Sequence, residues 1–223
     1  MPGQPFYPNS LAQLRALQSS VSPARLSTYE RLAYGNSRRG VALYLWNARA
    51  AGAFYFPLQT NEILLRNAIS AVLARVYGAN WPFSAGFERS LPRKSRGIFN
   101  TALTDLVGRL GPHGVAVGDV IAALTYGFWV ALLTARHDTR LWVPYFRTAF
   151  PGAPAQVDRE FIYNEANLLR DLRNRIAHHE PIAQRDLAVD YKRTLRIIRW
   201  ICPTTASWVV QHSQLASVIN QRP

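Results

Sequence analysis

The chain has 223 residues, of which 48% are hydrophobic and 12% are aromatic. This composition can bury a core and excludes an intrinsically disordered protein. The length fits one domain, so we expect a single domain over residues 1–223. The formal net charge is +13, from 26 basic and 13 acidic side chains.

The excess of positive charge is almost wholly arginine, because Lys94 and Lys192 are the only lysines. The planar, forked guanidinium suits phosphate, so this balance favours a polyanionic partner such as nucleic acid. The alternative is a GC-rich genome that encodes arginine wherever lysine would serve. Charge alone does not separate the two interpretations.

Cysteine usage and hydropathy exclude several further classes. Cys202 is the only cysteine, so neither an intrachain disulfide nor a thiolate metal site can form. The segment Met1–Ser10 has no basic stretch followed by an apolar run, so no signal peptide is expected. The most apolar window, Val120–Ala135, is shorter than the ~20 residues that a membrane span needs. We expect a soluble, cytoplasmic protein without membrane contact.

Apolar residues recur with a helical period along almost the whole chain. Ser22-Pro23 is typical of a helix start, and Tyr34-Gly35 of a helix end. Further helices are expected over residues 37–51, 58–77, 92–110, 119–133, 156–179, 186–201 and 207–219. Asp119 is the expected cap of the apolar helix, and Pro151–Pro154 is a loop. No strand alternation or hairpin signal is present, so the sequence predicts an all-α bundle.

The helix expected over residues 156–179 carries most of the chemistry. Pro181 disfavours helix at Glu180, so this helix should end at the two histidines that precede it. Its inner stripe is expected to consist of Phe161, Ala166, Leu169, Leu172 and Ile176.

The end of this helix reads Arg173-Asn174-Arg175-Ile176-Ala177-His178-His179-Glu180-Pro181. A metal-free ribonuclease needs such groups, because arginine can hold a phosphate and histidine can move a proton near neutral pH. We take Arg173, Asn174 and His178 as candidate catalytic residues, with His179 in support and Arg175 as an RNA contact. The alternative is a solvated helix end whose side chains only cap carbonyls.

Helix geometry separates the two central residues of this motif. Residues five apart lie about 140° around a helix, so Arg173 and His178 do not share a face, whereas Asn174 and His178 do. The long arginine side chain and the end of the helix before Pro181 can bring the first pair together.

Other polar residues are candidates for supporting roles. Glu62, Arg66 and Asn67 interrupt an otherwise apolar helix, and Glu62 and Arg66 are spaced for a plain helix salt bridge. The alternative is that these two orient Arg173 or His178 across the bundle.

A short basic patch contains Arg93, Lys94 and Arg96, which we take as candidate RNA-binding residues. The alternative is a solvated loop or helix start. Five aromatic residues are expected in the core or an interface, with base stacking as the other interpretation: Trp46, Tyr55, Trp81, Trp129 and Trp142.

Six ordered segments carry a family resemblance. They are Tyr44-Leu45-Trp46-Asn47, Phe54-Tyr55-x-Pro57-Leu58-Gln59, Glu62 with Leu65-Arg66-Asn67-Ala68-Ile69, Tyr77-Gly78-x-x-Trp81, Tyr126-Gly127-Phe128-Trp129 and Arg173-Asn174-x-x-x-His178-His179-Glu180-Pro181-Ile182. With these segments, the chain resembles the Abi-like (abortive infection) proteins of bacteria, in the HEPN ribonuclease superfamily, over about residues 28–200. Residues 1–27 would be an N-terminal helical extension and 204–223 a C-terminal helix.

The resemblance implies a HEPN-like up-and-down helical bundle with additional flanking helices. It also implies a homodimer whose two Arg-His motifs face one cleft, and RNA cleavage without a metal or cofactor. The expected role is that of a toxin or antiphage effector, with an antitoxin or another defence-system protein as a partner. The alternative is a non-catalytic HEPN module that binds nucleic acid or a partner protein.

Physical reasoning reaches the dimer separately. Attack by an RNA 2′-OH needs a base on one side of the phosphorus and an acid on the other. His178 and His179 are adjacent and point about 100° apart on a helix, so they cannot easily flank one phosphate. A second subunit with its own His178 would supply the missing group. No carboxylate pair, metal-ligand spacing, phosphate-cradling glycine loop or nucleophile elbow supports a kinase, metallohydrolase or serine hydrolase.

Overall fold

The computed structural model describes residue 8 and residues 10–223, and those residues contain helices and no strand. The predicted all-α class is confirmed. The α-helices are α1 (Leu11–Val21), α2 (Pro23–Leu32), α3 (Ser37–Tyr77), α4 (Ala85–Ser90), α5 (Arg93–Leu110), α6 (Val117–Ala123), α7 (Tyr126–Ala131), α8 (Val143–Ala149), α9 (Arg159–Ala177), α10 (Leu187–Ile201), α11 (Pro203–His212) and α12 (Leu215–Asn220). The described residues also contain two 3₁₀ turns, η1 (Trp81–Phe83) and η2 (Ala135–His137), and one π-helical turn, η3 (Asp138–Trp142).

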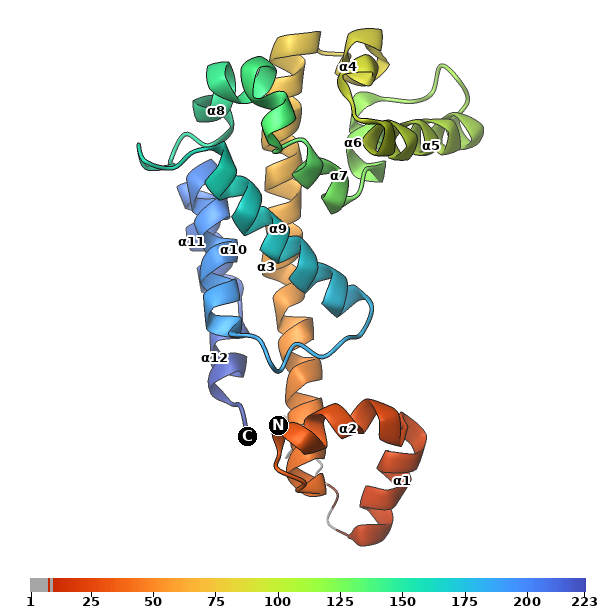
Figure 1. Ribbon diagram of the computed structural model, residues 1–223, viewed down its shortest axis with the longest axis vertical. Coiled ribbons are helices and arrows are strands. Elements are labelled where there is room, and N and C mark those ends of the chain that lie inside the picture. The colour runs from red at the N-terminus through yellow and green to blue at the C-terminus, as the bar shows by residue number, and fades with distance from the viewer. Residues whose placement is uncertain (1–7, 9) are drawn as a thin grey trace.

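Helix α3 runs along the long axis of the molecule, and the other elements are arranged around it (Figure 1). Helices α10 and α9 pack beside it, while α1 and α2 lie at its N-terminal end. Helices α4 to α8 gather around its C-terminal half, and α5 projects to one side. The site described below lies where α9 ends beside the middle of α3.

Helix α3 is one helix of 41 residues, not the two that the sequence predicted over residues 37–51 and 58–77. Asn36 caps its start by accepting from the Arg39 N–H, and Gly78 ends it at a φ of +89°. Proline removes one backbone donor from a helix interior and usually disfavours it there. Pro57 is nevertheless buried in this helix together with Phe54, so core packing offsets that cost.

The predicted apolar helix over residues 119–133 is also different in the structure. It is broken into α6 and α7, because the Thr125 hydroxyl accepts the Phe128 N–H and starts a new helix. Asp119 does not occupy the N-cap position. It lies inside the first turn of α6, and its carboxylate accepts the Ala116 N–H at 2.9 Å. Helix α5 begins and ends where Pro92 and Gly111 predicted.

Helix α9 starts at the Asp158 cap, three residues later than expected, and the proline-rich loop before it is present. Phe161 was predicted in its inner stripe but is 40% exposed, and Ile162 is buried in its place. Helix α10 matches the prediction. The predicted helix over residues 207–219 is instead α11 and α12, separated where Ser213 Oγ accepts the Leu215 N–H.

The predicted N-terminal extension, residues 1–27, includes residues that lie outside the described part of the chain, as does most of Met1–Ser10. Its described part contains α1 and the first half of α2. Leu26 and Tyr29 of α2 are buried against α3, so this hairpin is continuous with the core. In the described residues, no helix is long and apolar enough to cross a membrane.

Candidate functional site

Helix α9 ends at the histidine pair in a compact cap. His178 is the C-cap residue, and His179 adopts a φ of +56°, in the left-handed region where glycine is usual. The His179 N–H donates to the Ile176 carbonyl at 3.1 Å, and the Glu180 N–H to the Arg175 carbonyl at 2.7 Å. These two bonds form a Schellman cap, which reverses the chain. The reversal turns His179 out of the helical path that His178 still follows.

Arg173 lies one turn before this cap and faces α3. Its Nε is 3.6 Å from Glu62 Oε2, with side chains that are 45% and 21% exposed. This separation is too long for a good hydrogen bond, and an exposed ion pair of this kind contributes at most about 1 kcal/mol. The contact therefore orients the guanidinium more than it stabilises the fold. Within the described residues, Glu62 pairs across the bundle with Arg173 and makes no ion pair with Arg66.

A cavity of about 330 Å³ opens between α3 and the end of α9. It is lined by Tyr55, Leu58, Gln59, Glu62, Ile63, Arg66, Arg173, Ile176 and Ala177. The Nε of Arg66 is buried and has no hydrogen-bond partner among the described residues. Two guanidinium groups thus meet one carboxylate here, which leaves a net positive charge. Asn67 is exposed and does not line this cavity.

His178 and Asn174 lie on the outer side of the helix end. Both residues are exposed, and neither is among the described residues that line the cavity at Arg173. They are joined through the backbone, where the His178 N–H donates to the Asn174 carbonyl at 2.9 Å. Within the chain, the structure brings Arg173 together with Glu62 and Arg66 but does not bring His178 into that group.

His179 lies in a second cavity, of about 710 Å³, between α2, α3 and the cap of α9. Arg25 of α2 donates from Nη1 to the His179 carbonyl at 2.7 Å. Tyr55 and Ile176 line both cavities, so the two are neighbours along α3. Tyr55 is 68% exposed, which places it outside the core, unlike the four tryptophans predicted with it.

Two tyrosines near this surface keep their protons at neutral pH. Burial raises the pKa of Tyr29 to about 12, with a further contribution from Tyr44, while Arg25 opposes the shift. Burial also raises the pKa of Tyr126 well above its ordinary value, and the charge of Glu62 adds to this shift. Neither phenol is therefore ionised near neutral pH.

Asn47 of α3 fixes the chain directly after the motif. Its Oδ1 accepts the N–H of Ile182 at 2.8 Å and that of Ala183 at 3.0 Å. All three residues are buried. Two buried backbone donors depend on this one oxygen, so Asn47 determines where the segment after the histidines lies.

The remaining candidates occupy two other places. Arg175 is held at the cap, where its guanidinium donates to the Pro181 carbonyl at 3.2 Å and lies 3.7 Å from Glu180. Arg96 donates to the carbonyls of residues 88, 89 and 91 and thereby closes the end of α4. Arg93 and Lys94 are exposed.

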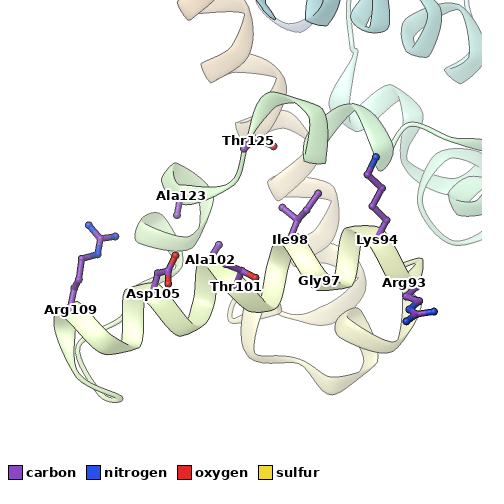
Figure 2. A pocket seen from close by; sticks show the side chains of 10 residues that line it. All are labelled: Arg93, Lys94, Gly97, Ile98, Thr101, Ala102, Asp105, Arg109, Ala123 and Thr125. Atoms are coloured by element: carbon purple, nitrogen blue, oxygen red, sulfur yellow. The ribbon is translucent and has the colours of Figure 1, made fainter. Parts of the chain in front are cut away.

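Arg93 and Lys94 line an open groove of about 1000 Å³ along α5. Figure 2 shows them near one end of α5 and Arg109 near the other, with Ile98 and Thr101 between. None of the residues that line this groove lines the Arg173 cavity.

Comparison of the chain with protein-family models, with curated proteins and with solved structures finds no match. Among the described residues, no group of three or more His, Cys, Asp and Glu side chains is placed to hold a metal ion.

Three residues of this surface were not predicted as site residues from the sequence: Asn47, Arg25 and Tyr55. Tyr55 was predicted in the core or an interface and lines the Arg173 cavity. Asn47 was noted only as part of a longer segment, and its contact spans more than a hundred residues. An asparagine on a mostly apolar helix face was the one available signal. Nothing in the local pattern around Arg25 indicates a contact with the α9 cap.

Proposed function

We propose that the protein is a metal-independent endoribonuclease of the HEPN type that acts through the end of α9. The observation that carries this proposal is the Arg173 guanidinium, which is exposed at a positively charged cavity and oriented by Glu62. A phosphate in this cavity would meet Arg173 and Arg66 together. The chain's formal net charge of +13 favours the approach of RNA.

In the proposed reaction, the 2′-hydroxyl of a ribonucleotide attacks the adjacent phosphorus. A histidine removes the hydroxyl proton, Arg173 stabilises the negative charge that builds on the phosphoryl oxygens, and a second histidine protonates the departing 5′-oxygen. Asn174 orients the scissile group. The products carry a 2′,3′-cyclic phosphate and a 5′-hydroxyl.

The proposal includes a homodimer, because one protomer does not assemble the required groups. His178 is exposed and is not among the residues that line the Arg173 cavity, and one chain offers one imidazole at that position. A two-fold axis near the ends of the two α9 helices would place both His178 side chains around one phosphate. The exposed ring of Tyr55 at the cavity rim suits either a subunit contact or a base.

The test is expression of the wild type and His178→Ala in bacteria, followed by mapping of new RNA ends. Loss of a positioned proton-transfer group typically costs ~10²–10⁴-fold in rate, so the variant should be folded and nearly inert. His113→Ala is the matched control, because His113 is an exposed histidine on the loop after α5. New ends that persist in His178→Ala would refute the proposal.

The second candidate is a HEPN-type module that binds RNA or a partner protein without cutting. One observation favours it: the separation of His178 from the Arg173 cavity in the single chain. RNA bound by the wild type without new ends, and released by Arg173→Ala, would select this candidate. A toxin or antiphage role is a further part of the proposal, and growth arrest on expression of the wild type alone would test it.

A further inference from the structure

A second polar cavity lies at the C-terminal end of α3, in a different part of the molecule from the α9 cap. Its volume is about 560 Å³. It is lined by Tyr77, Gly86, Arg89, Ser90, Arg136, His137, Thr139 and Arg140. Three of these eight residues are arginines, and none is a carboxylate.

The three arginines are not neutralised by neighbours. Over the part of the chain that the structure describes, none of Arg89, Arg136 and Arg140 forms an ion pair with a carboxylate. Arg136 donates from Nε to the Ser90 carbonyl at 3.3 Å, and Arg140 donates from Nη1 to the Tyr77 hydroxyl at 3.1 Å. These single bonds hold the two side chains at the cavity and leave most of their N–H groups available.

The two acidic side chains adjacent in sequence to cavity residues contact residues that do not line the cavity. Asp138 follows the cavity residue His137, but Arg159 holds its carboxylate at 2.8 Å. Glu88 precedes Arg89, and its Oε1 accepts from Asn100 at 3.1 Å. Among the described residues, neither carboxylate forms an ion pair with a guanidinium group of this cavity.

His137 adds an independent sign of a binding site. Its side chain is 3% exposed, and its Nε2 has no hydrogen-bond partner among the described residues. Burial lowers the pKa of His137 to about 4, and the charges of Arg136 and Arg140 lower it further while Asp138 opposes them. The imidazole is thus neutral at neutral pH. A buried polar atom without a partner is costly in a folded protein unless a ligand or water uses it.

The backbone next to His137 departs from regular α-helical winding. His137 ends the 3₁₀ turn η2, and Thr139 and Arg140 belong to η3, a π-helical turn. Single π turns occur frequently at functional sites, because they rotate side chains away from the α-helical spacing. Arg136, His137, Thr139 and Arg140 all line the cavity, within five residues that span this change of winding.

We propose that this cavity binds a small ligand that carries a diphosphate or triphosphate group. Three guanidinium groups match two or more negative charges, whereas an RNA phosphodiester carries one charge per phosphorus. The volume lies in the range of roughly 300–1,000 Å³ that is typical of small-molecule sites. This site is independent of the α9 motif and of RNA cleavage.

The experiment is isothermal titration calorimetry of the full chain with pyrophosphate, ADP and adenosine. Pyrophosphate and ADP should bind, with dissociation constants on the order of 10–100 μM, and adenosine should not. Arg89→Gln should weaken pyrophosphate binding about tenfold, since it removes one of the three charged hydrogen-bond donors. Arg89 has no side-chain hydrogen bond within the described residues, so its substitution should leave the fold intact. Arg136→Gln with Arg140→Gln should abolish binding.

Arg38→Gln is the matched control, because it removes one exposed arginine at the opposite end of α3 and should change affinity less than twofold. Thermal unfolding of each variant checks the fold, and pyrophosphate should raise the melting temperature of the wild type. Absence of heat with pyrophosphate up to millimolar concentration would overturn the proposal. Equal loss in Arg38→Gln, or adenosine binding as tightly as ADP, would overturn it too. The proposal would also fail if pyrophosphate did not bind while a 5′-hydroxyl RNA bound the wild type and not Arg89→Gln.

Discussion

Glu62 and Arg173 are distant in sequence, yet Oε2 of the first lies 3.6 Å from Nε of the second. Helix α3 supplies the carboxylate and α9 the guanidinium, at the point where α9 ends. Both side chains are partly exposed, so the ion pair adds little stability and mainly orients the guanidinium. Both side chains line the cavity between α3 and the end of α9.

Removal of this carboxylate should therefore affect activity more than stability. Glu62→Gln is expected to lower RNA cleavage about tenfold, which corresponds to about 1.4 kcal/mol, because Arg173 loses its orientation. The free energy of unfolding should change by less than about 1 kcal/mol. Asp171→Asn is the matched control, since it removes the carboxylate of another exposed ion pair, with Arg170 on α9, at 3.3 Å. Unchanged cleavage in Glu62→Gln would remove Glu62 from the site.

Asn47→Ala should be strongly destabilising. It leaves the buried N–H groups of Ile182 and Ala183 without their acceptor, at a cost of about 1–3 kcal/mol for each group. Denaturant unfolding should show a loss of at least about 2 kcal/mol. Asn100→Ala should cost much less, because Asn100 is exposed and bonds one side chain, Glu88. Similar losses in both variants would contradict the anchoring role of Asn47.

His179→Gly separates backbone shape from side-chain chemistry. Glycine adopts the φ of +56° without strain, so the variant should be as stable as the wild type or more stable by about 0.5–1 kcal/mol. Its cleavage rate should fall less than that of His178→Ala, because His178 is the proposed proton-transfer group. A rate loss equal to that of His178→Ala would instead make His179 the reacting imidazole.

Stability should depend on pH through His137. Its pKa is about 4 in the folded chain, below the ordinary value of 6.5, so the unfolded chain binds the proton at a higher pH than the folded one. The stability that comes from this neutral imidazole is present above pH 6.5 and is lost as the pH falls towards 4, by up to about 3 kcal/mol. His137→Gln should flatten the unfolding free energy between pH 6.5 and 4. An identical slope in both proteins would argue against the shift.

Much of the fold could be predicted from local sequence. Helical periods, the Ser22 cap and glycines at positive φ determine most helix ends from nearby residues, whereas the Asp158 cap of α9 was not predicted. The continuity of α3 could not be predicted, because the burial of Pro57 depends on partners from elsewhere in the chain. The break at Thr125 was missed because a hydroxyl competes there with an otherwise apolar helical run.

Some features of the candidate site could also be predicted from local sequence, and others could not. The sequence predicted that the motif would lie at a helix end, since Pro181 acts locally. It also left open a contact between Glu62 and Arg173, which the structure contains. It could not indicate that His179 would turn towards Arg25 while His178 stayed outside. That outcome depends on the cap conformation and on the packing of α2, which no local pattern encodes.

Subunit mixing tests the composite cleft. If each phosphate needs His178 from both chains, a dimer with one His178→Ala subunit is inactive. Equal mixing of wild type and variant, after subunit exchange, should then leave about a quarter of the activity and not about half. A linear fall with the wild-type fraction would show that each subunit acts alone, and light scattering would establish whether a dimer forms.

The central claim is metal-free cleavage by 2′-hydroxyl attack, and the chemistry of the product ends tests it most directly. Purified protein should be incubated with RNA in excess EDTA, and the new ends should then be identified by mass spectrometry. We predict 2′,3′-cyclic phosphate and 5′-hydroxyl ends, none of which form with His178→Ala or with a substrate that has 2′-deoxyribose at the cleaved position. Cleavage of the deoxy substrate, silence in EDTA, or 3′-hydroxyl and 5′-phosphate ends would contradict the account.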